Sequence, residues 1–210
     1  MKIALFGATG GTGKAFIDQA IAAGHTVHAL VRDLSKIDAR DGLTITQGDA
    51  RDGDAVASVL EGADAAVSTL GNFNRKPNTE VSDATKTLIA AMEDKGPKRL
   101  VVVSTIGVGD SYKPLQSFMF KYVVIGWAAK NIWKDRERQE DAIRASSLDW
   151  TLARPGGLTD EGHTGTYQIV GGGDAQPKKI SISRADVADF CLKALTSPDY
   201  ASGKTVCLFY

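Results

Sequence analysis

The 210-residue sequence predicts an α/β fold in which a single domain is built on a doubly wound parallel sheet. Three observations predict this fold. Short apolar runs alternate with segments of helical periodicity, as expected where helices connect parallel strands. The run Leu100-Val101-Val102-Val103 is apolar on both faces, which is typical of a strand buried in such a sheet. A glycine-rich turn directly follows the first apolar run.

Seven strands follow from the apolar runs. They are expected at residues 2–6, 26–31, 43–46, 65–68, 99–104, 150–153 and 205–208. Three helices show one apolar face, around residues 16–21, 81–92 and 187–195. Asn78 or Thr79 is expected to cap the second of these helices, and Ser183 with Asp186 the third. Two loop-rich stretches, 71–77 and 156–179, are candidates for the walls of a ligand crevice.

The composition excludes several classes of function. Lys and Arg number 25 and so do Asp and Glu, so no basic excess favours nucleic acid or an anionic membrane. Two cysteines, Cys191 and Cys207, are too few for a disulfide framework and indicate packed thiols in a reducing compartment. The start MKIALFGATGG lacks the pattern of a signal peptide, which favours a cytoplasmic protein. We expect no membrane span, and a monomer or a homodimer.

The glycine turn is the most specific motif in the chain. It reads Gly7-Ala8-Thr9-Gly10-Gly11-Thr12-Gly13, between the first strand and the first helix. Glycines three apart permit a tight strand exit, close approach of a pyrophosphate, and close contact between helix and sheet. The helix amino terminus then offers free amides to the anion. A glycine turn without a ligand is the alternative; a nucleoside-triphosphate loop is disfavoured because Ala8 and Ala15 replace residues that it needs.

Two positions after the next strands bear on the choice of dinucleotide. Arg32 ends the second strand, and a guanidinium there can bind the 2′-phosphate of NADP. Asp33 keeps NAD possible, and a solvated Arg32–Asp33 pair is the alternative. Asp49, followed by Ala50, either accepts a hydrogen bond from the adenine amino group or caps a turn. The sequence therefore favours NADP as the cofactor.

These motifs, with Ser68-Thr69-Leu70-Gly71, Val103-Ser104-Thr105 and the run Leu148 to Gly156, give the chain an end-to-end resemblance to the atypical short-chain dehydrogenase/reductases. Within them it is similar to the NmrA-like and flavin reductase/biliverdin reductase B-like proteins. The resemblance implies a Rossmann fold in which the dinucleotide also contacts Leu70, Gly71, Arg154, Pro155 and Gly156. It also implies that Ser104 is a catalytic residue that orients substrate, although a plain strand-end hydroxyl is the alternative.

One departure from the family restricts the chemistry. Short-chain dehydrogenases carry a Tyr and a Lys four residues apart, but Ile132 and Arg136 occupy the corresponding positions here. Without that acid, hydride transfer suits acceptors that spread the resulting charge over a conjugated system. We therefore expect an NADPH-dependent reductase of a flavin, a quinone or a similar conjugated small molecule. An NmrA-like sensor of NADP(H) with little turnover is the alternative from another class, while a sugar-nucleotide epimerase would need the missing Tyr.

The substrate pocket is expected to form from residues 71–80, 105–133 and 154–180. Candidate substrate contacts are Thr105, Tyr112, Phe118 and Trp127, since flat rings stack on flat acceptors. Burial of these aromatics against the sheet or a second subunit is the alternative. The mixed-charge run 134–141 is expected to be a solvated helix face, with Glu140 a weak candidate for the pocket. Three scattered histidines predict no metal site.

Overall fold

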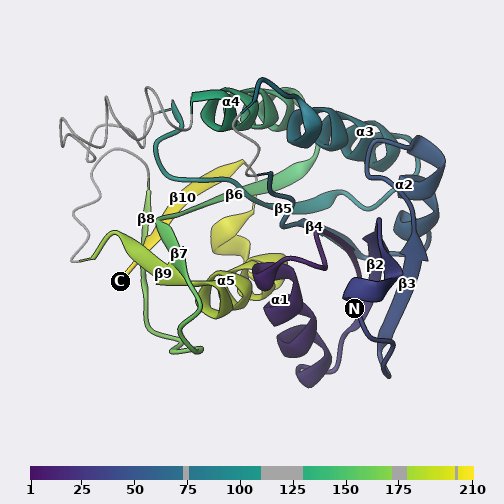
Figure 1. Ribbon diagram of the computed structural model, residues 1–210, viewed down its shortest axis with the longest axis horizontal. Coiled ribbons are helices and arrows are strands. Elements are labelled where there is room, and N and C mark those ends of the chain that lie inside the picture. The colour runs from purple at the N-terminus through teal and green to yellow at the C-terminus, as the bar shows by residue number, and fades with distance from the viewer. Residues whose placement is uncertain (73–75, 110–129, 172–178, 202) are drawn as a thin grey trace.

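The computed structural model describes residues 1–72, 76–109, 130–171, 179–201 and 203–210. Its centre is an eight-stranded sheet with the order β3-β2-β1-β4-β5-β6-β10-β8 (Figure 1). All neighbouring strands are parallel except β8, which runs antiparallel to β10 at the edge. The strands are β1 (Lys2–Phe6), β2 (Thr26–Val31), β3 (Leu43–Gln47), β4 (Ala65–Ser68), β5 (Arg99–Val103), β6 (Asp149–Pro155), β8 (Gln168–Gly171) and β10 (Lys204–Phe209). This is the doubly wound, single-domain α/β architecture that the sequence predicts.

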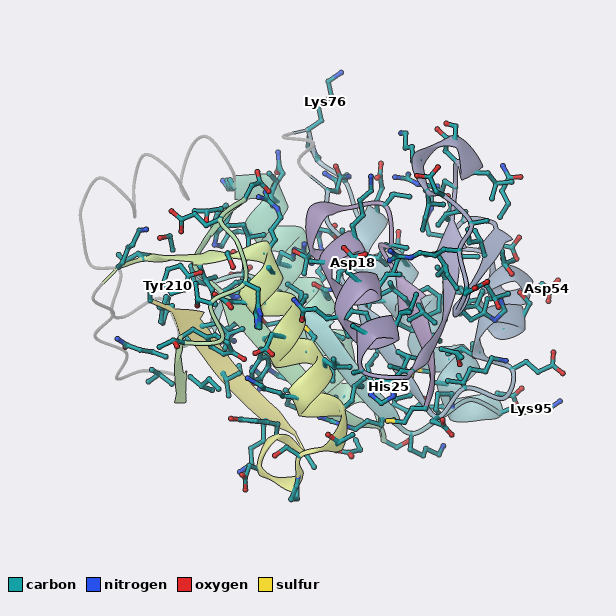
Figure 2. All side chains as sticks on the ribbon, turned by 90° about the horizontal axis from the view of Figure 1, so that it is seen from below. Asp18, His25, Asp54, Lys76, Lys95 and Tyr210 are labelled. Carbon is teal, nitrogen blue, oxygen red and sulfur yellow. The ribbon has the colours of Figure 1, made fainter. Side chains whose placement is uncertain are left out.

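Helices cover both faces of the sheet. α1 (Gly11–Ala22) and α5 (Arg184–Thr196) lie side by side on one face, as Figure 2 shows. α2 (Gly53–Leu60), α3 (Glu80–Asp94) and α4 (Lys130–Ala145) pack together on the other face (Figure 1). Each layer buries its own apolar cluster against the sheet, and Leu100 to Val102 are fully buried between the two. Burial on both faces explains why β5 has no polar alternation.

All seven predicted strands are present, with changes at their ends. β3 extends to Gln47, β5 stops at Val103, and β6 runs through Pro155. The stretch 156–179, expected to be loop, contains β8 and β7 (Gly157–Thr159), which pairs with β9 (Ser181–Ser183). These strands have three or four residues each, too short to give an alternating pattern. Helix α2 was not predicted either; Asp52 caps it by accepting from the amides of Asp54 and Ala55.

A buried carboxylate fastens part of the 156–179 stretch to α5. Asp186 is fully buried, and it accepts hydrogen bonds from the amides of Thr164 and Gly165 and from the hydroxyls of Thr164 and Tyr210. Burial favours the neutral acid, but these hydrogen bonds hold the pKa of Asp186 at about 2. The amide of Asp186 in turn donates to the Ser183 hydroxyl, which confirms the predicted cap of α5.

The other expectations on local structure are mostly met. Cys191 and Cys207 are buried, reduced cysteines, and burial raises the pKa of Cys191 to about 12. Among the described residues, no helix combines the length and the apolar character needed to cross a membrane. Thr79 is the N-cap residue of α3, one of the two predicted, but its side chain makes no capping bond and donates instead to Asp83.

The glycine turn brings the start of α1 against β1. Gly7 has a φ of +95°, a left-handed conformation that glycine adopts without strain, and a Cβ there would lie 2.7 Å from the carbonyl carbon of Thr69. A Cβ on Gly13 would lie 2.3 Å from the carbonyl oxygen of Gly7 and 2.8 Å from the Cα of Ala8. Both contacts are with backbone, so neither can be relieved by rotating a side chain.

We expect Gly13→Ala to destabilise the fold by about 2 kcal/mol or more, because overpacking against backbone outweighs the helical preference of alanine. Urea unfolding followed by circular dichroism measures this change. Gly53→Ala is the matched control, since Gly53 also lies in the first turn of a helix and a Cβ there meets nothing within 4 Å. Equal stabilities of the two variants would show that the close approach is not required.

Candidate functional site

A long groove runs across the carboxyl ends of β1, β2, β4 and β5, where ligands bind in open α/β sheets. Residues from the glycine turn, both neighbouring strand ends, α3, α4 and α5 line it. They include Gly7, Thr9, Gly10, Gly11, Thr12, Arg32, Lys36, Asp49, Ala50, Arg51, Leu70, Gly71, Glu80, Ser104, Arg136, Leu158 and Arg184. The structure thus brings together most residues that the sequence assigns to cofactor binding. Gly13 lies beneath the turn as its packing contact.

The middle of the groove is built to hold an anion. Gly10 is the N-cap residue of α1, no side chain caps this helix, and its first turn contains no acidic residue. Its first amides and the positive end of its dipole are therefore available to a diphosphate. Arg184 crosses the turn so closely that its Cδ would lie 2.5 Å from a Cβ on Gly11, and its guanidinium pairs with Asp160 at 2.6 Å.

Cations gather at the β2 end of the groove. The side chain of Arg32 is exposed and has no hydrogen-bond or ion-pair partner within the described ranges. Asp33 turns away to cap a short 3₁₀ helix, Leu34–Lys36, by accepting from the amide and hydroxyl of Ser35 at 3.0 and 2.7 Å. The alternative of a solvated Arg32–Asp33 pair is therefore not what the structure shows. Lys36 lies 3.7 Å from Asp33.

Asp49 has the turn-capping role that the sequence offered, and it also lines the groove. It lines the groove, and it also holds its own turn by accepting from the amide of Arg51 and, through both carboxylate oxygens, from its guanidinium at 2.9 and 2.7 Å. These hydrogen bonds with Arg51 lower the pKa of Asp49 to about 2. The group is a carboxylate at neutral pH, and carboxylate oxygens can accept further hydrogen bonds from an amino group.

Arg136 is the buried cation at the β5 end of the groove. Its side chain is only 9% exposed, and its Nη1 donates to the carbonyl of Val103 at 3.2 Å and to Gln139 at 2.7 Å. Its Nη2 donates to the carbonyl of Leu70 at 2.8 Å. Burial lowers the pKa of Arg136 to about 10, so the guanidinium stays charged at neutral pH. The groove thus ends on a fixed cation held by neutral oxygens.

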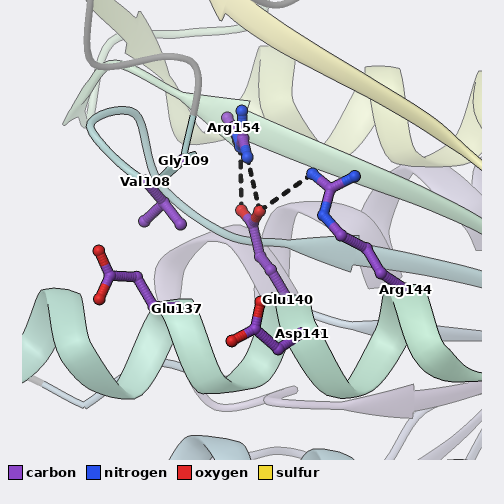
Figure 3. Close-up of a pocket in the computed structure, with 7 residues that line it drawn as sticks. All are labelled: Val108, Gly109, Glu137, Glu140, Asp141, Arg144 and Arg154. Carbon is purple, nitrogen blue, oxygen red and sulfur yellow. Dashed lines mark hydrogen bonds and ion pairs between the residues drawn. The ribbon is translucent and has the colours of Figure 1, made fainter.

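Ser104 belongs to a buried charged network beside Arg136. Its hydroxyl donates to Oε1 of Glu140 at 2.7 Å. The same carboxylate accepts two hydrogen bonds from Arg154, at 2.9 and 2.6 Å, and one from Arg144 at 3.3 Å. In Figure 3, Glu140 points from α4 towards Arg154 on β6, and Arg144 reaches the carboxylate from the next helical turn. Side chains of Glu140 and Arg154 are 3% and 1% exposed.

The expectation of a solvated helix face at residues 134–141 is therefore met by only half of the residues: Lys134, Glu137, Arg138 and Asp141 are exposed. Asp135, Arg136, Gln139 and Glu140 are all buried. Asp135 supplies the missing cap of α3, because its carboxylate accepts from the amides of Val81 and Ser82. Each buried charge on α4 has partners in another element, which sequence spacing along one helix does not reveal.

Three cofactor contacts implied by the family resemblance lie elsewhere. Arg154, Pro155 and Gly156 are not among the described residues that line the groove. Arg154 lines a second cavity with Val108, Gly109, Glu137, Glu140, Asp141 and Arg144. The amide of Gly156 donates to Leu208, and the carbonyl of Pro155 accepts from Ile106. Their role is to join β6 to its neighbours.

The substrate contacts are only partly covered by the structure. Thr105 does not line the groove within the described ranges, and its hydroxyl donates to the carbonyl of Ile106 at 3.3 Å. Tyr112, Phe118 and Trp127 lie outside the described residues. Sequence reasoning missed Lys36, Arg51 and Arg184 as groove residues, whereas Glu80 and Leu158 lie in the segments 71–80 and 154–180 that were expected to form the pocket. Only Arg51 could have been found from the local sequence, because it lies two residues after Asp49 at a strand end. The others belong to elements whose packing the sequence did not specify.

Fold and groove together define a dinucleotide-binding protein of the Rossmann type. The residues of the groove fit NAD(P)H. The start of α1 has no side-chain cap, so its amides can bind a diphosphate, and the turn before it is so tight that a Cβ on Gly7 would strike the backbone of Thr69. Residues 7–198 match the family of NAD(P)H-binding proteins, and the chain belongs to this family. It is an NAD(P)H-dependent oxidoreductase, and the resemblance to atypical short-chain dehydrogenase/reductases is confirmed.

Relatives cover the whole chain. The structure of ChuY from Escherichia coli O157:H7, named an anaerobilin reductase, is 28% identical over 100% of this chain and 97% of its own, with a TM-score of 0.82. YwnB from Bacillus subtilis is 28% identical over 95% of this chain and 94% of its own length. Isoflavone reductase homolog P3 from Arabidopsis thaliana is 25% identical over 94% of this chain and 65% of its own.

The buried pair of Glu140 and Arg154 gives a test of the site's architecture. We expect Glu140→Leu to cost about 3–5 kcal/mol in unfolding free energy, because Arg154 loses the carboxylate that offsets its charge. The double variant Glu140→Leu/Arg154→Met should recover most of that loss, since apolar side chains of similar volume replace both charges. Chemical denaturation of the two variants decides the point; an equally unstable double variant would contradict it.

Proposed function

We propose that the protein is an NADPH-dependent reductase that passes a hydride to a flavin, a quinone or a similar conjugated small molecule. The observation that carries the proposal is the contrast between the two ends of the groove. One end has a free, exposed cation where a 2′-phosphate would lie, and the other has a serine and an arginine but, within the described residues, no tyrosine. When bound, the nicotinamide ring supplies the hydride.

The preference for NADPH rests on Arg32. Its guanidinium makes no hydrogen bond or ion pair with the described residues. The carboxylate of Asp33, which a ribose 2′-hydroxyl of NADH would need, accepts hydrogen bonds from Ser35. Asp33 is also absent from the described lining of the groove. Lys36 adds positive charge at the same end. A phosphate therefore gains charge-assisted hydrogen bonds that a hydroxyl does not.

The choice of acceptor follows from the absence of an acid at the β5 end. A simple ketone becomes a localised alkoxide after hydride addition and needs a positioned proton donor. Arg136 and Ser104 are not suited to donate that proton. Arg136 stays charged at neutral pH, and the hydroxyl of Ser104 already donates its proton to Glu140. A conjugated acceptor spreads the charge and takes its proton from water. Holding it over the nicotinamide then provides most of the rate enhancement.

The relatives support a conjugated acceptor. ChuY carries the name of an anaerobilin reductase, which points to a tetrapyrrole-like substrate for that protein. Its 28% identity extends over this whole chain. We therefore place a linear tetrapyrrole beside flavins and quinones among the acceptors to be tried.

The proposal is tested by following NADPH oxidation at 340 nm with FMN, riboflavin, a soluble quinone and a linear tetrapyrrole. We expect turnover with at least one of them, and none with simple aliphatic ketones. Tight binding of NADPH in calorimetry without turnover of any acceptor would refute the reductase and favour a dinucleotide sensor. Faster reduction of ketones than of conjugated acceptors would refute the argument about the missing acid.

We expect Arg32→Ala to weaken NADPH binding about 10- to 100-fold while changing NADH binding less than threefold, because only NADPH loses a charge-assisted contact. Titration calorimetry with both coenzymes measures the difference. Arg40→Ala is the matched control, because Arg40 pairs with Asp18 at 2.6 Å and is not among the groove residues. Equal losses for the two coenzymes would show that Arg32 does not contact the phosphate.

A further inference from the structure

We propose that the β5 end of the groove recognises an amide-type edge, an N–H group beside a carbonyl, with Ser104 as the acceptor and Arg136 as the donor. This recognition deepens the proposed reductase and rests on it only for the identity of the acceptor. Such an edge occurs in the lactam rings of linear tetrapyrroles, in the imide of a flavin ring, and in the carboxamide of nicotinamide.

The direction of the Ser104 hydrogen bond is the first step. A hydroxyl has one proton to donate and two lone pairs that accept. Glu140 lies between Arg154 and Arg144 and receives hydrogen bonds from both, so it is a carboxylate and can only accept. The proton of Ser104 therefore points to Glu140, 2.7 Å away. What Ser104 offers to the groove is a lone pair, which binds an N–H or O–H group of a ligand.

The second step is the donor capacity of Arg136. A guanidinium has five N–H bonds. Three of them reach Val103, Gln139 and Leu70, which leaves one N–H on Nη2 and the Nε–H without a partner among the described residues. The bond to the carbonyl of Val103 holds the guanidinium next to the residue that precedes Ser104. Ser104 and Arg136 both line the groove, so an acceptor and a donor are available at its β5 end.

The third step is the ligand that satisfies both. Ser104 is 4% exposed and Arg136 9%, so a ligand that reaches them leaves water behind. A buried group left without its hydrogen bond is unfavourable, and the pair therefore discriminates strongly between ligands. A bare carbonyl satisfies Arg136 but leaves the lone pair of Ser104 without a proton. An N–H beside a carbonyl satisfies both.

Glu140 and Arg154 are positioning residues in this scheme. They do not line the groove within the described part of the chain, but they fix which way the Ser104 proton points. Their pairing in the second cavity, drawn in Figure 3, holds the carboxylate of Glu140 in place beside Ser104. A neutral amide at position 140 can donate to Ser104 as well as accept, which would free the serine proton for the groove.

The test measures binding, so it does not depend on turnover. Calorimetry compares riboflavin with N3-methylriboflavin on the NADP⁺-loaded protein, and NADP⁺ with its 3-acetylpyridine analogue, in which a methyl replaces the carboxamide nitrogen. We expect wild type to bind the N–H form about tenfold more tightly in one of the two comparisons, and Ser104→Ala to lose this preference. Preference in the riboflavin comparison assigns the edge to the acceptor, and preference in the dinucleotide comparison assigns it to the cofactor.

Two further variants separate recognition from folding. Ser68→Ala removes another buried hydroxyl at a strand end, one without a hydrogen-bond partner among the described residues, and should keep the wild-type preference. Glu140→Gln should reduce the preference while leaving the affinity for the methylated ligand within about threefold. The inference is overturned if wild type shows no preference in either comparison, or if Ser104→Ala retains it. A lack of NADPH turnover with bound ligands would instead refute only the proposed function.

Discussion

The close contact between Gly13 and the backbone of Gly7 is the constraint on which the rest of the structure depends. It lets α1 begin directly at the carboxyl end of β1, so the positive end of the helix faces the space between β2 and β4. The anion site is therefore a property of the backbone. Side chains at the neighbouring strand ends, among them Arg32 and Ser104, line the same groove, and the proposed function assigns to them the choice of ligand.

Helix α4, on the face of the sheet opposite α1, carries three buried charged side chains. Moving an ion out of water is expensive unless other groups replace its hydration. Helix α4 meets this requirement three times: Asp135 accepts from amides of α3, Glu140 pairs with Arg154, and Arg136 donates to the carbonyl of Val103 at the end of β5. These partners also lock α4 against α3, β5 and β6. Of these three buried charges, Arg136 lines the β5 end of the groove, and Asp135 and Glu140 lie next to it on α4.

The parts of the fold and site that the sequence predicted are those with a local cause. The glycine turn, Arg32 and Asp49 follow strand ends directly, and their positions depend on a few neighbouring residues. Arg154 lines the second cavity and not the described part of the groove. Successive residues of a strand face opposite sides, so proximity to a candidate loop did not fix the direction of its side chain. The hydroxyl of Ser104 donates to Glu140, which is 36 residues away in the sequence, and this bond decides what Ser104 can offer to the groove. No spacing rule connects them before the fold is known.

The two ends of the groove differ in how strongly water screens them. Arg32 is exposed, so its contribution to cofactor choice falls as salt is added. Ser104 and Arg136 are buried, where hydrogen bonds are stronger and unpaired groups more unfavourable. Selection among acceptors therefore rests on a stricter physical basis than selection between coenzymes. If both proposals hold, the groove should tolerate an exchange of dinucleotide better than a change in the hydrogen-bonding edge at its inner end.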